Sequence, residues 1–145
     1  MAKAYASTVV NAPAEAVWAR IRDFNGLPGW HPGIDRSQIE EGKRSDQVGC
    51  VRDFYLKDGA HIREKLLGFS DLERSQTYNF QLTPFPVQNY VATLKVTPVT
   101  DGNRTFVEWS TTFDVAPDQI GQWQDTFANG VFQGGFDALK KHFGG

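Results

Sequence analysis

The sequence predicts an α+β fold in which a curved, seven-stranded antiparallel sheet wraps around one long C-terminal helix, with two short helices closing one end. Three observations predict this fold. Apolar and polar side chains alternate through the middle of the chain, as in strands with one face on a core and the other in water. Residues 117–142 have the spacing of a helix that is apolar around more than half of its circumference. The chain has 145 residues, and we expect residues 1–145 to form a single domain.

The expected curvature follows from the number of strands and helices. Seven strands spaced about 4.8 Å apart make a sheet roughly 30 Å wide. One helix is only about 10–12 Å across. A flat sheet would leave most of its apolar face in water, because the sequence has no second long helix. We therefore expect the sheet to bend around the C-terminal helix.

The N-terminal third predicts a strand, a short helix and a loop. Residues 4–10 have strand character, and Pro13 suits the first turn of an amphipathic helix over residues 13–24. Residues 25–33 are rich in glycine and proline, which predicts a loop or at most one more turn of helix. Residues 35–47 predict a weak strand followed by a loop.

Five more strands are predicted in the rest of the chain. They cover residues 48–56, 60–69, 77–82, 88–97 and 105–115. The alternation is cleanest in the last three strands. Their core-facing residues are predicted to be Tyr78, Phe80, Leu82, Tyr90, Ala92, Leu94, Val96, Val107, Trp109, Thr111 and Phe113.

The hairpin around residues 57–59 has two possible registers. A two-residue turn would place Asp53 opposite Glu64, and like charges directly opposite each other are unfavourable. A three-residue loop with Gly59 in the left-handed conformation pairs Arg52 with Glu64 instead. We expect the second register, which places Arg52 and Glu64 on the mainly apolar face. There they are either an ion pair that fixes the register or a polar anchor for a ligand.

Two further features have alternative interpretations. His31 follows Trp30 in the loop, and it is either an exposed histidine or a gate residue or general acid/base at the mouth of a pocket. The last helix has two apolar stripes, so it is apolar over a wide arc or it kinks between them. Its glycines indicate a bend, close packing, or volume left for a ligand. These glycines are Gly130, Gly134 and Gly135.

Composition excludes several classes of function. The net charge is −2 and no basic stripe is present, so we expect no nucleic-acid partner. Cys50 is the single cysteine, which rules out an intrachain disulfide, and no spacing suggests a metal site or a phosphate loop. We expect no cofactor, no stable membrane insertion, a monomer or homodimer, and a cytoplasmic location, because the N-terminus lacks a signal-peptide pattern.

The chain resembles the START-like (SRPBCC) superfamily, which includes the birch-pollen allergen, and within it the small bacterial proteins of the polyketide cyclase/dehydrase family. The segments that carry the resemblance are residues 11–18, 21–24, 30–32, 49–52, 58–59, 62–66, 84–90 and 107–109. The resemblance implies a helix-grip fold with a cavity between the sheet and the long helix. It does not imply a reaction, because the superfamily includes lipid carriers, receptors and cyclases.

The first functional hypothesis is a binding protein for a small apolar or aromatic ligand. Aromatic side chains would form the walls or the mouth of the cavity, Arg52 and Glu64 would orient a polar end of the ligand, and Trp30 and Phe85 could gate access. The predicted aromatic wall residues are Trp30, Tyr78, Phe85, Tyr90, Trp109, Trp123 and Phe127.

Two other hypotheses remain open. The protein could be a cofactor-independent cyclase, dehydratase or aromatase, in which Arg52 stabilises an enolate oxygen and Glu64 or His31 moves a proton. Arg52 would oppose this role for Glu64 by holding the carboxylate ionised. Alternatively, the chain could be an interaction or stress-response module whose cavity is filled by its own side chains.

Overall fold

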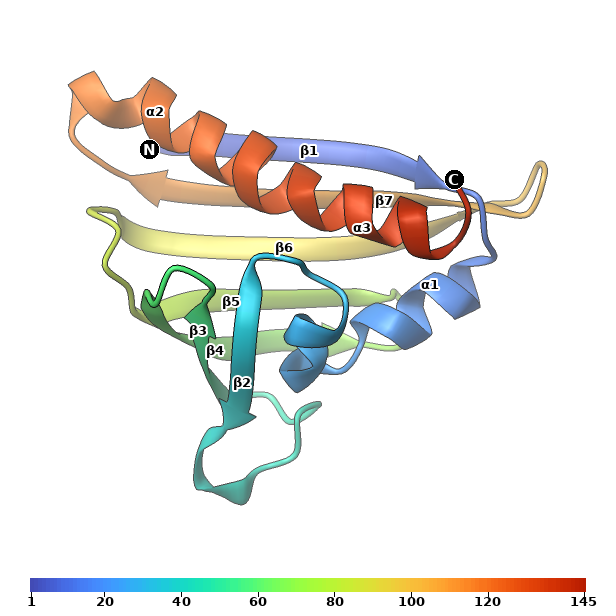
Figure 1. Ribbon diagram of the computed structural model, residues 1–145, viewed down its shortest axis with the longest axis horizontal. Helices are drawn as coiled ribbons and strands as arrows, with labels where there is room; N and C mark the ends of the chain where they lie inside the picture. The colour runs from blue at the N-terminus through green and yellow to red at the C-terminus, as the bar shows by residue number, and fades with distance from the viewer.

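Seven antiparallel strands form one sheet in the computed structural model, which describes residues 1–145 (Figure 1). The strands are β1 (Ala2–Val10), β2 (Ile34–Ile39), β3 (Val51–Leu56), β4 (His61–Ser70), β5 (Ser75–Leu82), β6 (Gln88–Val99) and β7 (Arg104–Asp114). Their order across the sheet is β1-β7-β6-β5-β4-β3-β2, so β1 pairs with the last strand and every other pairing is between consecutive strands. The predicted α+β fold with a seven-stranded antiparallel sheet is confirmed.

The sheet bends around the C-terminal helix, as the width argument predicted. In Figure 1 the helix lies across β1, β7 and β6, and β2 crosses steeply over β4 and β5 on the same side of the sheet. Register shifts interrupt the pairing of β2 with β3 between Ile34 and Arg36. Two more interrupt the pairing of β4 with β5. Such bulges bend a strand and increase its twist, so they contribute to the curvature at this end of the sheet.

The C-terminal helix is continuous but changes its winding. It begins with a 3-10 turn at Pro117–Gln119 and continues as α2 (Ile120–Asp125), a π-helical segment (Thr126–Phe132) and α3 (Gln133–His142). A π-helical turn contains more residues than an α-helical turn, so it rotates the side chains that follow. This change of winding explains the two apolar stripes in the sequence. Because the π-helical segment rotates the side chains that follow it, residues of both stripes face the core.

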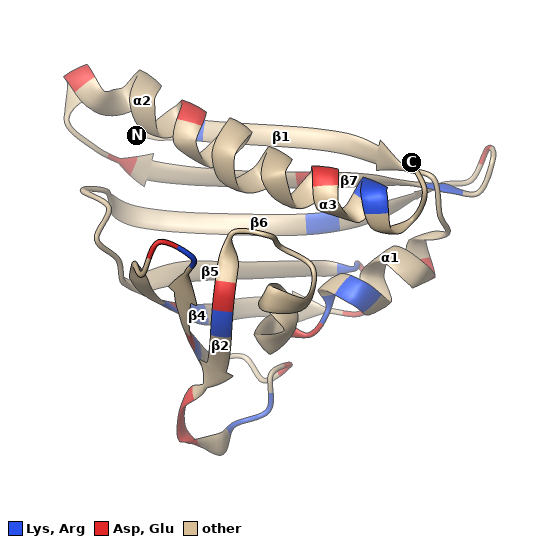
Figure 2. Cartoon of the chain, in the orientation of Figure 1, with Lys and Arg blue, Asp and Glu red and all other residues tan.

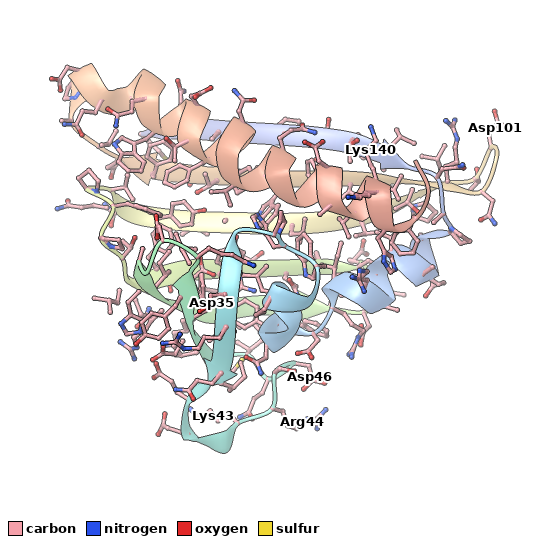
Figure 3. The ribbon with its side chains drawn as sticks, in the orientation of Figure 1. Asp35, Lys43, Arg44, Asp46, Asp101 and Lys140 are labelled. Carbon is pink, nitrogen blue, oxygen red and sulfur yellow. The ribbon has the colours of Figure 1, made fainter.

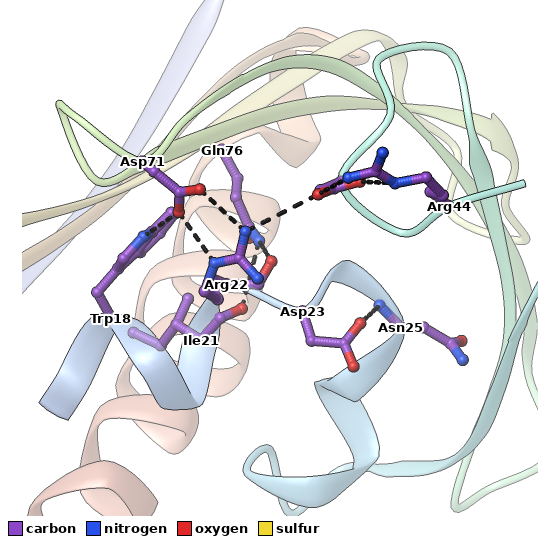
Figure 4. A network of polar contacts seen from close by, with 9 residues as sticks. Trp18, Ile21, Arg22, Asp23, Asn25, Arg44, Asp71 and Gln76 are labelled. Carbon is purple, nitrogen blue, oxygen red and sulfur yellow. Dashed lines mark hydrogen bonds and ion pairs between the residues drawn. The ribbon is translucent and has the colours of Figure 1, made fainter. Parts of the chain in front are cut away.

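The first helix is shorter than predicted. It is α1 (Ala14–Ile21), and a separate 3-10 helix follows at Phe24–Gly29. The Gln76 side-chain amide donates to the carbonyls of Ile21 and Arg22 at 3.3 and 2.9 Å, which satisfies the end of α1 (Figure 4). The Asp23 carboxylate accepts the backbone N–H of Asn25 at 3.0 Å and so caps the next helix.

A polar network ties α1 to two loops (Figure 4). Asp71, in the turn between β4 and β5, accepts from Trp18 Nε1 at 2.7 Å and from two nitrogens of Arg22 at 2.9 Å. Arg22 also approaches Asp46, which pairs with Arg44 in the loop between β2 and β3. The charged partners are partly or largely exposed, so each ion pair contributes little to the stability of the fold. Their common effect is to hold the short helices at one end of the sheet.

The core is a single cluster of 29 buried apolar side chains. The core-facing residues predicted from the alternation are buried, except for Phe80, which is half-buried, and Leu82, which is 44% exposed at the end of β5. The inward prediction for Leu82 was wrong, because the strand ends there at the rim of the sheet. Charged positions are scattered over the surface without a long run of one sign (Figure 2).

Most charged side chains lie on the outside of the molecule, and Arg52 and Glu64 are the buried exceptions. Figure 3 labels charged residues on the loops, on β2 and on the outward side of the C-terminal helix, and these are Asp35, Lys43, Arg44, Asp46, Asp101 and Lys140. None of the helices is both long and apolar enough to cross a membrane.

Candidate functional site

A mainly apolar cavity lies between the concave face of the sheet and the π-helical segment. Fifteen residues line it, and twelve of them are hydrophobic. They come from the 3-10 helix and loop before β2, from β2 to β7 and from the C-terminal helix. The lining residues are Leu27, His31, Ile34, Arg52, Phe54, Leu56, Ile62, Glu64, Tyr78, Phe80, Phe85, Tyr90, Trp109, Phe127 and Val131.

The cavity is small. The centre of a water-sized sphere can occupy about 50 Å³ inside it. A single water needs about 10–15 Å³ by this measure, so the space holds roughly three to five water-sized groups. At about 30 Å³ of liquid volume per water, this corresponds to one small ring rather than a fused-ring compound or a long acyl chain.

The polar centre of the cavity wall is the ion pair between Arg52 on β3 and Glu64 on β4. The two residues are directly opposite each other in the register, as the three-residue loop predicted, and Gly59 in that loop has φ of +94°. Both are buried, with 3% and 4% of their surface exposed. Arg52 Nε donates to Glu64 Oε1 at 2.8 Å, and Nη2 lies 2.7 Å from the same oxygen in the ion pair. The predicted register is confirmed, and the pair faces the interior.

The rest of the Arg52 guanidinium is held by neighbouring groups. Nη1 donates to the carbonyl of Phe24 at 3.0 Å. The Phe24 ring lies 3.9 Å from the guanidinium carbon and the Tyr78 ring 4.8 Å from it, so aromatic faces cover the cation. The position of Arg52 is therefore fixed by a carboxylate, a carbonyl and two rings.

Burial raises the pKa of Glu64 above its ordinary value. The charge of Arg52 and its hydrogen bonds act in the opposite direction and offset only part of this effect. We expected Arg52 to dominate and to make Glu64 a weak acid. The expectation that Arg52 holds the carboxylate ionised stays a prediction, because a carboxyl in a close ion pair can keep its charge at pH 7 although burial raises its pKa.

Two buried tyrosines complete the polar part of the wall. Tyr78 Oη accepts a hydrogen bond from Trp109 Nε1 at 3.0 Å. The Tyr90 ring stacks on Phe80, with ring centroids 3.9 Å apart. Burial is the main cause that raises the pKa of both tyrosines, and the charge of Glu64 raises both further. Both phenols are therefore neutral near pH 7 and keep a hydroxyl proton to donate.

His31 is buried, which removes the interpretation of an exposed loop histidine. Its Nε2 lies 2.7 Å from the carbonyl oxygen of Val131 in the π-helical segment, and its Nδ1 accepts the backbone N–H of Gly33 at 3.1 Å. Because a carbonyl can only accept, the neutral ring carries its proton on Nε2. Burial lowers the pKa of His31. His31 thus joins the loop before β2 to the C-terminal helix.

Gly135 allows this close contact between loop and helix. A Cβ atom at this position would lie 3.0 Å from His31 Cδ2, 3.0 Å from the Trp30 ring and 3.1 Å from the Trp109 ring. A Cβ at Gly130 or Gly134 would meet nothing within 4 Å. Of the alternatives for the helix glycines, close packing therefore applies to Gly135.

Phe85 closes the cavity on the side of the loop between β5 and β6. It stands between Pro84 and Pro86 and is half-buried. Its ring centroid lies 5.2 Å from that of Trp123 and 6.0 Å from that of Phe127. Phe85 therefore forms part of the wall of the cavity on this side, together with Phe80 and Tyr90.

Most of the predicted site residues meet at the cavity. Its lining includes the predicted polar and aromatic residues Arg52, Glu64, Tyr78, Phe85, Tyr90, Trp109 and Phe127, together with His31. Trp30 and Trp123 are corrections, because neither lines the cavity. Trp30 is buried against Trp109, with centroids 5.7 Å apart, and Trp123 packs behind Phe85.

Sequence reasoning missed several lining residues as members of the site. Phe54, Leu56 and Ile62 share the face of Arg52 and Glu64, and Phe80 shares the face of Tyr78, so the register and the alternation contained the signal for them. The other three come from separate elements that meet only in the fold, and of these only Val131 had a sequence signal, the apolar helix stripe that it shares with Phe127. These are Leu27, Ile34 and Val131.

The model of a protein family described as "Polyketide cyclase / dehydrase and lipid transport" matches residues 1–144. The chain belongs to this family. The resemblance predicted from the sequence is thereby confirmed, and the helix-grip architecture agrees with the START-like superfamily.

Solved structures of bacterial proteins are similar over nearly the whole chain. The protein XoxI from Bacillus cereus is 37% identical, with a TM-score of 0.89 over 99% of this chain and 96% of its own. An uncharacterised protein from Bacillus thuringiensis is 35% identical, with a TM-score of 0.84 over 99% of this chain and 100% of its own.

A plant enzyme shares the fold. Norcoclaurine synthase from Thalictrum flavum is 19% identical, with a TM-score of 0.76 over 97% of this chain and 84% of its own. That structure is a complex with dopamine and hydroxybenzaldehyde. At this identity the similarity shows a common fold.

Proposed function

We propose that this protein binds a small hydrophobic or aromatic metabolite in the cavity between the curved sheet and the C-terminal helix. The observation that carries the proposal is the apolar space of about 50 Å³ inside an otherwise packed aromatic core. Protein interiors are close packed, and a void loses the dispersion contacts of the atoms that line it. An apolar cavity with a few convergent polar groups is the usual form of a ligand site.

Family membership supports this proposal at a general level. The description of the family names lipid transport as well as cyclase and dehydrase activity. Norcoclaurine synthase holds dopamine and hydroxybenzaldehyde, each with one aromatic ring, on the same fold. The size of the cavity favours a ligand of similar bulk over a long-chain lipid.

A titration of the purified protein with toluene, followed by backbone amide NMR shifts, tests the proposal. We expect saturable shifts at residues around the cavity. Ile62→Phe places a larger side chain into the space, and overpacking of about 1–3 kcal/mol should weaken binding about fivefold or more. Val91→Phe is the matched control, because Val91 is 38% exposed and does not line the cavity. Equal loss in both variants, or no saturable shift of the wild type with toluene or with any of the other one-ring compounds tested below, would refute the proposal.

A second candidate is a cofactor-independent cyclase or dehydratase acting on a similar ligand. The raised pKa of Glu64 favours it, because proton transfer is most efficient when the pKa of the group is near the working pH. Arg52 would stabilise an enolate oxygen, and Glu64 would move the proton. His31 is the other predicted proton-transfer group, although both its ring nitrogens have partners in the protein.

Arg52→Ala and Glu64→Ala separate these candidates. In an enzyme they should abolish turnover of a cyclisable substrate while the circular dichroism spectrum stays native. In a binding protein they should change ligand preference. In a module with a filled interior, no ring compound should bind the wild type. The cytoplasmic location and the monomeric or homodimeric state stay predictions.

A further inference from the structure

We propose, building on the proposed ligand-binding function, that the cavity selects neutral single-ring compounds carrying a hydroxyl or N–H group, which donates to Glu64 Oε2. Rings without a donor and rings carrying a carboxylate would bind more weakly. The proposal rests on which atoms of the Arg52–Glu64 pair already have hydrogen-bond partners in the protein and which do not.

The first step is the state of Arg52. Its Nε donates to Glu64 Oε1, its Nη1 donates to the Phe24 carbonyl, and its Nη2 lies 2.7 Å from Glu64 Oε1, so the Nε/Nη2 edge already faces a carboxylate. Rings of Phe24 and Tyr78 cover the guanidinium at 3.9 and 4.8 Å. The positive charge is compensated by Glu64 at 2.7 Å. Arg52 is therefore poorly placed to recognise a ligand carboxylate, which normally requires a free guanidinium fork.

The second step is the asymmetry of Glu64. Both contacts with Arg52 go to Oε1, and no other protein group donates to the carboxylate. The residue is 96% buried and lines the cavity. A carboxylate has about four acceptor positions, and an unsatisfied buried acceptor is costly. Oε2 is thus a hydrogen-bond acceptor inside an apolar cavity, and a donor group on the ligand satisfies it.

The third step is the set of groups around Glu64. Tyr78 and Tyr90 line the same cavity, and both keep a hydroxyl proton. A ligand hydroxyl can donate a hydrogen bond to Glu64 Oε2 and can accept one from a tyrosine, so it acts both as a donor and as an acceptor. A ligand carboxylate would instead bring a second negative charge next to Glu64, without a free cation to balance it.

The experiment compares four one-ring compounds by the same NMR titration at pH 7.5. Phenol has a donor, anisole has only an acceptor, toluene has neither, and benzoate is an anion. We expect phenol to bind at least about tenfold more tightly than anisole or toluene, because one hydrogen bond to a charged group is worth about 1.5–3 kcal/mol. We expect benzoate not to bind measurably.

Glu64→Gln should reverse this order. The amide removes the negative charge and leaves Arg52 uncompensated, so phenol should lose about tenfold in affinity and benzoate should gain. The double variant Arg52→Met/Glu64→Leu covers the possibility that the single variant does not fold, since apolar replacements of a buried ion pair often keep stability. In it, phenol should bind no better than toluene. Glu108→Gln, on β7 and outside the cavity, is the matched control and should keep the wild-type order.

The outcomes distinguish this inference from the proposed function. If toluene and anisole bind the wild type as well as phenol does, or if benzoate binds best, the inference is overturned while ligand binding stands. If none of the four compounds binds, the proposed function itself fails, and the inference with it.

Discussion

At the scale of single residues, we expect the Arg52–Glu64 pair to affect both the stability and the chemistry of the interior. The pair is buried among aromatic rings, where an ion without its partner is strongly destabilising. Its geometry is asymmetric, because Arg52 bonds only one of the two carboxylate oxygens. The same residues are partners in the register of β3 with β4 and both line the cavity.

Removing one partner of the pair should cost more than removing both. Arg52→Met leaves the carboxyl of Glu64 buried alone, and we expect the free energy of unfolding at pH 7 to fall by about 3–5 kcal/mol. Arg52→Met/Glu64→Leu should be close to the wild type. Urea denaturation measures both, and Arg36→Met, on the exposed side of β2, is the control for removing an arginine. Equal destabilisation by the single and double variants would contradict a role of the charge itself.

His31 should make stability depend on pH. Burial lowers its pKa below the ordinary value of 6.5, so between that value and the lowered pKa only the unfolded chain takes up the proton. The contribution of His31 to stability is complete above pH 6.5 and is lost as the pH falls, by at most about 1.4 kcal/mol per unit.

The comparison of wild type with His31→Gln isolates this contribution. The difference in their free energies of unfolding should shrink as the pH falls from 7.5 to 5.5, because only the wild type has a buried histidine at this position. His142→Gln, near the exposed end of α3, should show no such change. A difference for His31→Gln that is constant over this range would contradict the prediction.

At the scale of elements, the π-helical segment and Gly135 set the fit between the C-terminal helix and the loop before β2. The segment places Phe127 and Val131 on the cavity and leaves the Val131 carbonyl in contact with His31. Gly135, one α-helical turn further, lets Trp30 and His31 approach the helix backbone. The helix is thus packed most tightly next to the cavity.

Two neighbouring glycines should respond in opposite ways to alanine. Gly134→Ala meets no atom within 4 Å and should stabilise the helix by about 0.5–1 kcal/mol. Gly135→Ala would bring Cβ to 3.0 Å from two aromatic side chains and should destabilise the fold despite the same gain in helix propensity. Thermal denaturation of the two variants is the measurement, and stabilisation by Gly135→Ala would show that the contact is loose.

At the scale of the whole molecule, curvature creates the cavity and one loop closes it. Strands β2 and β3 bend over the concave face toward the C-terminal helix, and the loop between β5 and β6 supplies Phe85 (Figure 1). Prolines on both sides restrict the backbone of this loop, so we expect opening to depend on the Phe85 ring rather than on a large movement of the chain.

Phe85→Ala should therefore speed the exchange of ligand. We expect the association and dissociation rates of a bound ring compound to rise together by several-fold, because the mutation removes a barrier that both directions cross. NMR exchange spectroscopy measures these rates. Leu82→Ala, at the exposed end of β5, is the control. A rise in the dissociation rate alone would identify Phe85 as a binding contact rather than a gate.

Much of the fold could be predicted from local pattern. The alternation in β5 to β7, the charge argument for the β3–β4 hairpin and the width of the sheet against one helix led to the observed architecture. Boundaries were less accurate, since α1 ends where the Gln76 side chain satisfies its carbonyls from a strand far along the chain. Leu82 was placed inward by the alternation, although β5 ends at the rim.

The sequence by itself determined which residues share the inner face of the sheet, because side-chain direction in a strand follows from a period of two and register follows from charge. Only the tertiary structure decided which of these residues surround empty space. That space depends on where the helix changes its winding, on the close contact of Trp30 and His31 with Gly135, and on the position of Phe85. These features bring together segments that are distant in the sequence. Periodicity can be recognised from neighbouring residues, whereas packing depends on contacts between residues far apart in the sequence.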